Sequence, residues 1–115
     1  MDARLTPAAA LAALARSDDG KPFLTLFRHG SLEVEIYRPQ GRDLQQPHVR
    51  DEVYVVVSGS GEFVHGGQRR PFEPGEVLFV PAGAEHRFEN FSDDFATWVL
   101  FYGPEGGEHS TQEQA

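Results

Sequence analysis

From residue 21 to residue 102 the chain is a succession of short runs rich in Phe, Val, Ile, Leu and Tyr, separated by Gly, Pro, Asn or Asp. Such runs are typical of β-strands, and the residues between them are typical of tight turns. A chain with many short strands has to bury its sheet edges, which a small closed barrel or a two-sheet jelly roll achieves. We therefore predict an all-β domain with strands at residues 23–28, 32–37, 45–48, 53–57, 62–65, 70–72, 77–80, 86–90 and 96–102.

The segment before this region predicts one short helix. Thr6 and Pro7 suit the N-cap and the first helical position, and the Ala-rich stretch that follows favours a helix up to the Ser-Asp-Asp-Gly sequence before the first strand. A length of 115 residues is that of a single domain. We predict an N-terminal helix and linker at residues 1–20, a β-barrel at residues 21–102 and a polar, disordered tail at residues 103–115.

Composition and charge exclude several classes of protein. Ten Lys and Arg against 18 Asp and Glu give a formal net charge of −8, which would repel a phosphate backbone, so nucleic acid is not an expected partner. The sequence contains no cysteine, so disulfides, thiolate metal sites and cysteine nucleophiles are excluded. The Ala-rich stretch is too short to span a membrane and lacks the features of a signal peptide. We expect a cytoplasmic protein without membrane contact.

The segment at residues 75–90, GEVLFVPAGAEHRFEN, combines a strand, a tight turn and a second strand. Pro81 presets φ and Gly83 permits a left-handed turn residue, so the returning strand brings His86 toward the mouth of the barrel. The segment resembles the second motif of the cupin superfamily, GxxxxxPxGxxHxxxN, at all five fixed positions. The resemblance implies a double-stranded β-helix, or jelly-roll barrel, in which His86 binds a metal. On its residues alone, His86 could also be a hydrogen-bonded core histidine.

An upstream stretch resembles the first cupin motif, GxxxxxHxHxxxExxxxxxG, in part. With Glu52 as the acid of this motif, His48 is its second histidine and Gln46 stands where the first histidine belongs. The resemblance implies a metal site formed by Gln46, His48, Glu52 and His86. On a strand, Gln46 and His48 would share a face, and a turn could return Glu52 to the same side.

Two imidazoles and one carboxylate are the facial triad of non-haem Fe(II) oxygenases, and this set also accepts Mn, Ni, Co or Zn. We therefore expect one divalent metal ion, whose identity the residues do not decide. The glutamine leaves several interpretations open: its amide oxygen binds weakly, swings away, or bonds the substrate, or the site has decayed. A metal with a single carboxylate ligand keeps a net positive charge, which favours an anionic or enolizable substrate.

The strands around this site carry further candidates. Tyr54, Tyr102 and Glu85 are candidates for a catalytic acid or base. Tyr54 and Trp98 each carry a polar group that needs a partner when buried. Aromatic side chains either line a substrate pocket or form plain core; these are Phe63, Phe79, Phe88 and Trp98.

The remaining charged residues are expected at the surface. Alternation in the run at residues 32–37 predicts that its valine and isoleucine face the core and that Glu33 and Glu35 face solvent. The histidines at positions 29, 65 and 109 fall at hairpin ends or in the tail, where solvent exposure is the usual explanation.

The resemblance implies several functions, because cupins include dioxygenases, isomerases, decarboxylases and sugar-binding regulatory domains. Our first hypothesis is a metal-dependent enzyme, a dioxygenase-type oxidoreductase acting on a small oxygen-bearing organic molecule. The alternatives are a non-catalytic small-molecule binding or sensing module and a metal-dependent isomerase or lyase. Apolar runs such as residues 53–57 and 97–101 have few polar alternates, which predicts a homodimer formed through an outer sheet face.

Overall fold

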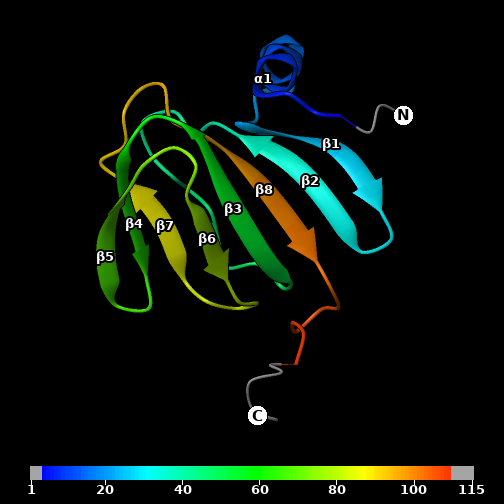
Figure 1. Ribbon diagram of the computed structural model, residues 1–115, viewed down its shortest axis with the longest axis vertical. Helices are drawn as coiled ribbons and strands as arrows, with labels where there is room; N and C mark the ends of the chain where they lie inside the picture. The colour runs from blue at the N-terminus through cyan, green and yellow to red at the C-terminus, as the bar shows by residue number, and fades with distance from the viewer. Residues whose placement is uncertain (1–3, 110–115) are drawn as a thin grey trace.

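The computed structural model describes residues 4–109 and shows an all-β fold with one short helix (Figure 1). The helix α1 spans Pro7–Arg16. The strands within the described residues are β1 (Phe23–His29), β2 (Leu32–Tyr37), β3 (Asp51–Ser58), β4 (Gly61–His65), β5 (Gln68–Phe72), β6 (Val77–Val80), β7 (His86–Glu89) and β8 (Ala96–Tyr102).

The strands form two antiparallel sheets that pack face to face as a jelly-roll barrel. The larger sheet has the order β1-β2-β8-β3-β6 and the smaller one has the order β5-β4-β7. The side chains between the sheets make direct contact, since the ring of Tyr54 on β3 lies 4.9 Å from that of Phe88 on β7. The predicted double-stranded β-helix is thus confirmed.

Aromatic rings fill the space between the two sheets. Tyr54, Phe72, Phe88 and Phe95 are each at most 1% exposed, and Phe63 packs against the same cluster. The rings meet edge-on or tilted, with Phe88 and Phe95 4.7 Å apart, as aromatic packing favours. This cluster closes one end of the barrel and leaves the other end for polar residues.

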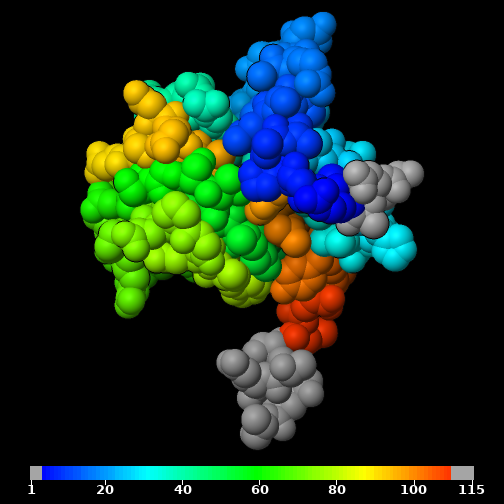
Figure 2. Space-filling view, turned by 45° about the horizontal axis from the view of Figure 1, so that its top comes forward, coloured from blue at the N-terminus to red at the C-terminus, as the bar shows by residue number. Residues whose placement is uncertain are grey.

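Helix α1 begins where the sequence predicts. The hydroxyl of Thr6 accepts a hydrogen bond from the backbone N–H of Ala9 at 3.2 Å, which is the N-cap interaction. Only Ala10 of the helix is buried, so α1 packs lightly, against β1 and β2. The helix projects from the body of the molecule (Figures 1 and 2). No helix among residues 4–109 is long and apolar enough to cross a membrane.

Two predicted segments differ from the structure. Residues 45–48 form no strand but an extended loop, whose polar groups bond to side chains rather than to a neighbouring strand. In the tail, residues 103–109 pack on the barrel, because Asp51 accepts the backbone N–H of Glu108 at 2.8 Å and Val49 accepts that of Gly106 at 2.7 Å. Residues 110–115 of the predicted disordered tail and residues 1–3 of the predicted N-terminal segment lie outside the described residues.

The strand register determines which side chains enter the barrel. Residues directly opposite one another on antiparallel strands share a face, and Glu35, Val99 and Tyr54 are opposite in turn across β2, β8 and β3. Because Tyr54 and Val99 belong to the core, Glu35 also faces the interior. The same argument applies to Glu33, which lies in a row with Phe101 and Glu52.

The prediction that Glu33 and Glu35 face solvent is therefore wrong. Val34 and Ile36 alternate with them on the other face of the large sheet, in rows with Leu100 and Trp98, and Ile36 is fully buried there, as predicted. Alternation alone shows that a strand has two different faces, but not which of them is inside. Here both faces of the sheet carry apolar residues, so the usual rule assigned the faces in the wrong order.

Candidate metal centre

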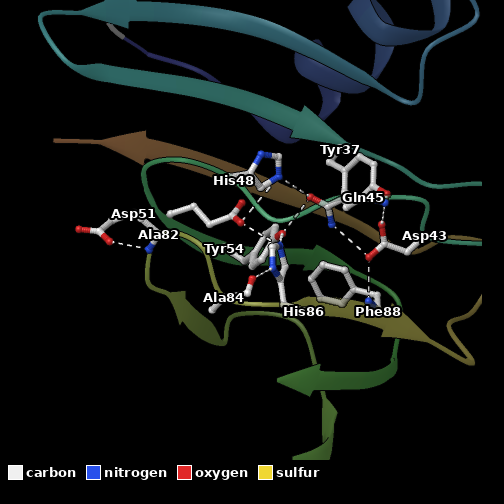
Figure 3. A network of polar contacts seen from close by, with 11 residues as sticks. Tyr37, Asp43, Gln45, His48, Asp51, Tyr54, Ala82, Ala84, His86 and Phe88 are labelled. Carbon is white, nitrogen blue, oxygen red and sulfur yellow. Dashed lines mark hydrogen bonds and ion pairs between the residues drawn. The ribbon is translucent and has the colours of Figure 1, made fainter. Parts of the chain in front are cut away.

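His48, Glu52 and His86 converge on one point, and Figure 3 shows His48 and His86 beside Tyr54 and Gln45. Each offers one ligand atom, and these atoms lie within 4.8 Å of one another. The carboxylate oxygen Oε1 of Glu52 lies 2.8 Å from Nε2 of His86 and 3.8 Å from Nε2 of His48. The structure thus brings together three residues that the sequence predicted as ligands of one metal ion.

Three different elements supply these residues. Glu52 is on β3, His48 is in the loop before it, and His86 begins β7 in the opposite sheet. The tight turn before β7 is tied to that loop, since the N–H of Gly83 donates to the carbonyl of His48 at 2.7 Å. Gly83 has φ of 81°, the left-handed conformation that the sequence predicted for this turn. The turn therefore fixes the spacing of the two imidazoles.

The environment of the Glu52 carboxylate indicates whether these residues fit a cation. Its side chain is fully buried, and neither carboxylate oxygen has a hydrogen-bond partner within the described part of the chain. A buried carboxylate without donors is strongly unfavourable unless a positive charge compensates it. The donor set of one carboxylate and two imidazoles is the set that divalent first-row metals accept. The residues therefore fit one divalent metal ion.

The orientation of His86 supports the same assignment. Its Nδ1 lies 2.9 Å from the carbonyl of Ala84, so Nδ1 carries the proton and Nε2 presents a lone pair toward Glu52. Two lone pairs 2.8 Å apart need a proton or a metal ion between them. Burial alone would lower the pKa of His86, but the Glu52 carboxylate and the Ala84 carbonyl outweigh it and raise this pKa.

The amide next to the triad belongs to Gln45. The prediction assigned this position to Gln46, but Gln46 is exposed, whereas Oε1 of Gln45 lies 3.2 Å from Nε2 of His48. The motif alignment assumed a regular strand, in which His48 and the residue two before it share a face. Because the segment is a loop, the alternation fails and the adjacent residue faces the site.

Asp43 holds this amide in place, and sequence reasoning missed it. Its carboxylate accepts three hydrogen bonds: from Nε2 of Gln45 at 3.1 Å, from the hydroxyl of Tyr37 at 2.6 Å and from the backbone N–H of Phe88 at 2.8 Å. With Nε2 bound to Asp43, the Gln45 amide must present its oxygen to His48. The sequence signal for this role is an acid two residues before the segment that was expected to form a strand.

Tyr54 lies beside the triad as a protonated hydroxyl. Its oxygen donates to Oε1 of Gln45 at 3.0 Å and lies 2.9 Å from Nε2 of His86. Burial raises the pKa of Tyr54 well above its ordinary value, and the charge of Glu52 adds to this effect. The side chain is therefore a hydrogen-bond donor rather than a base near neutral pH.

Tyr102, the other predicted acid or base, does not face the triad. It is opposite Asp51 on β3 and lies on the other side of β8 from Phe101, whose ring packs 4.8 Å from that of His48. The register of β8 therefore aims Tyr102 away from the candidate metal centre, and its assignment to the site is corrected.

The predicted aromatic lining divides between the two faces of the sheets. Phe63 and Phe88 face the interior and belong to the core. Phe79 is 50% exposed on β6, and Trp98 lies in an outer-face row with Val55, so these two predictions are wrong. Strand spacing placed all four on β-strands correctly but could not determine the inward side of β6 and β8.

Two further titratable residues reach the interior near the triad. His65 is opposite His86 in the pairing of β4 with β7, and both border a cavity of about 410 Å³, although the side chain of His86 itself is fully buried. Glu35 enters from β2, and burial raises its pKa from 4.5 to about 7, with the charges of Glu33 and Glu52 adding to the shift. Both residues had been predicted to face solvent.

The sequence and the fold were compared with known proteins. A family model described as a cupin domain matches residues 33–102. The chain belongs to the cupin domain family. Among curated proteins, this cupin is 36% identical over 91 residues to an uncharacterized protein of Streptomyces coelicolor, a match that covers 77% of this chain and 86% of that protein.

Two solved structures illustrate the similarity in fold. A cupin 2 conserved barrel domain protein from Salinispora arenicola is 24% identical, with a TM-score of 0.63, and the match covers 90% of this chain and 89% of that one. A putative mannose-6-phosphate isomerase from Ralstonia eutropha is 27% identical, with a TM-score of 0.60, and the match covers 78% of this cupin and 94% of that chain.

The raised pKa of Glu35 predicts a pH-dependent stability. The folded state binds the proton of this carboxyl more tightly than the unfolded state, so the contribution of Glu35 to stability is fully present below pH 4.5 and is lost as the pH rises through about 7. In Glu35→Gln this loss is absent. Because the carboxyl keeps partial contact with solvent, we expect the free energy of unfolding of the wild type to fall by about 1 kcal/mol relative to the variant across this range. Urea unfolding of both proteins at several pH values measures this difference, and a constant difference would contradict it.

Proposed function

We propose that this cupin is a mononuclear metal-dependent enzyme, a dioxygenase-type oxidoreductase acting on a small oxygen-bearing organic molecule. The observation that carries the proposal is the buried Glu52 carboxylate, which has no hydrogen-bond donor in the described structure and faces two imidazoles. This set matches the facial triad of non-haem Fe(II) oxygenases. When bound, the metal would supply Lewis-acid chemistry and, if it is iron, redox chemistry.

The residues around the triad have distinct roles in this proposal. His48, Glu52 and His86 hold the ion, and the Ala84 carbonyl keeps Nε2 of His86 available as a ligand atom. Tyr54 donates a hydrogen bond toward the site, and the aromatic cluster beneath it excludes water. A cavity lined by His65, Glu85 and Arg87 lies beside His86, whose side chain is itself buried.

A metal-dependent isomerase or lyase is the second candidate. Such an enzyme needs an acid or base that exchanges protons near neutral pH, and Glu35 is an interior carboxyl whose pKa is raised to about 7. The similarity to a putative mannose-6-phosphate isomerase also favours this candidate. In a non-catalytic binding module, by contrast, metal would bind and no compound would be converted.

Metal content and oxygen consumption test the proposal. Protein purified without chelator should contain about one Fe or Mn ion per chain, and His48→Ala and His86→Ala should each lower metal affinity at least about tenfold. Oxygen uptake is then measured with a panel of thiols, diketones, catechols and flavonols. We expect uptake with at least one compound class in the wild type and none in either variant.

His29→Ala is the matched control, because His29 ends β1 at an exposed position away from the triad. It should keep both metal and activity. Uptake that persists in the double variant of His48 and His86 would refute the dioxygenase proposal. Conversion of a compound at the same rate without dioxygen would instead favour the isomerase or lyase.

We also propose that two copies of this cupin pair through the outer face of the large sheet. Val77 and Phe79 on the edge strand β6 are 66% and 50% exposed, and they continue the rows of Val53 and Val55 on β3. A continuous apolar surface of this kind is typical of an interface between subunits. A second copy presenting the same face would cover it with two-fold symmetry.

Phe79→Lys tests this pairing, because a charge within an apolar interface disfavours association. Light scattering coupled to gel filtration should give the mass of a dimer for the wild type and of a monomer for Phe79→Lys. Val49→Lys, at an equally exposed apolar residue outside β6, should remain a dimer. A monomeric wild type at all concentrations would contradict the proposal.

A further inference from the structure

A second cavity lies between α1 and the barrel, away from the triad. Its volume is about 570 Å³, which is within the range of small-molecule sites. One wall is formed by Leu11 and Leu14 of α1, and the opposite side by Phe23 and Leu44. The two leucines are only partly buried by the protein itself, so the helix leaves apolar surface facing the cavity.

The charged residues that line the cavity are all cations. Lys21, Arg38 and Arg42 line it, and no Asp or Glu does, although acids outnumber bases in the chain and its net charge is −8. Within the described residues none of these three cations forms an ion pair. The Arg38 guanidinium lies 3.4 Å from the Asp93 carbonyl, which is a neutral partner.

Two acids next to the cavity-lining cations in the sequence, Asp19 and Asp43, accept hydrogen bonds from other groups. The carboxylate of Asp19 accepts the backbone N–H of Lys21 and the hydroxyl of Ser17, both at 3.0 Å. Asp43, behind the cavity wall, accepts hydrogen bonds from Tyr37 and Gln45. The cavity therefore combines an apolar wall with three cations. Lys21 lies over the ring of Phe23 and is attracted to Asp19, whereas Arg38 and Arg42 form no ion pair within the described part of the chain.

We propose that this cavity is a second binding site, for a small amphipathic organic anion in which a carboxylate or sulfonate is attached to an aromatic or aliphatic group. The apolar part would pack on the leucines of α1, and the anionic group would pair with Arg38 and Arg42. An acidic protein otherwise repels anions, so three cations around one apolar cavity provide selectivity for such a ligand.

The inner wall of the cavity connects it to the candidate metal centre. Tyr37 and Gln45 line the cavity, and the Oε1 atom of the same Gln45 lies 3.2 Å from Nε2 of His48. A bound anion would therefore contact a residue that also touches the triad. Binding itself requires no metal, so this proposal stands or falls independently of the proposed enzyme activity.

Two fluorescent probes that differ by one charge test the proposal. Anilinonaphthalene sulfonate is an amphipathic anion, and N-phenylnaphthylamine is its neutral counterpart. Both are titrated into the full chain in the presence of a chelator. We expect the wild type to bind the anion more tightly than the neutral probe, and the double variant Arg38→Gln with Arg42→Gln to lose about tenfold in affinity for the anion only.

Matched variants separate this site from other apolar surfaces. Arg70→Gln removes one exposed arginine from β5, outside the cavity, and should leave both affinities unchanged, whereas Leu14→Gln should weaken both probes. Circular dichroism verifies that each variant is folded. Anion affinity that is unchanged in the double variant, or lowered equally by Arg70→Gln, would overturn the proposal, as would a wild type without preference for the anion.

Discussion

The burial of one carboxylate is the constraint around which this molecule is arranged. Glu52 is fully buried in the barrel, and neither of its oxygens has a hydrogen-bond donor among the described residues. The free-energy cost of such a group is several kcal/mol unless a cation lies against it. Two imidazole nitrogens lie close to Oε1, and they compensate the charge when they share a proton or a metal ion with it.

The surrounding structure positions these nitrogens instead of neutralising the carboxylate. The Ala84 carbonyl fixes the ring of His86, and the turn at Gly83 is bonded to the loop that carries His48. Asp43 orients the amide of Gln45 toward the same point. Several backbone and side-chain hydrogen bonds thus hold these side chains in one geometry, which is typical of a preorganised binding site.

The second motif could be predicted closely from the sequence because each of its residues has a local reason. Pro81 and Gly83 specify the turn, and the turn determines where His86 begins β7. The N-cap of α1 also depends on a local interaction, since the hydroxyl of Thr6 accepts a hydrogen bond from Ala9, three residues further along the chain. By contrast, the choice between Gln45 and Gln46 depended on whether residues 45–48 form a strand. Asp43 binds the side chain of Gln45 in the observed loop, and it is itself bound to Phe88, which is distant in the sequence.

The inward and outward faces of the large sheet could not be predicted for a related reason. In β2 the acids face the interior, and in β6 and β8 the residues Phe79 and Trp98 face outward. An apolar outer face and a partly polar interior invert the usual pattern. The sequence of a strand shows that its two faces differ. Only the assembled barrel shows that the face with Glu33 and Glu35 is the inner one, on the side of the candidate metal centre.

The most direct test of this account is to compare the unfolding of the wild type and Glu52→Gln in chelator and then with Fe(II), Mn(II), Ni(II), Co(II) or Zn(II) added in turn. If the carboxylate is uncompensated without metal, the variant should be at least as stable as the wild type in chelator. At least one metal should then raise the unfolding midpoint of the wild type but leave the unfolding midpoint of Glu52→Gln unchanged. Stabilisation of both proteins by the same amount, or a loss of more than about 1 kcal/mol by the variant in chelator, would show that Glu52 already has its partners within the protein.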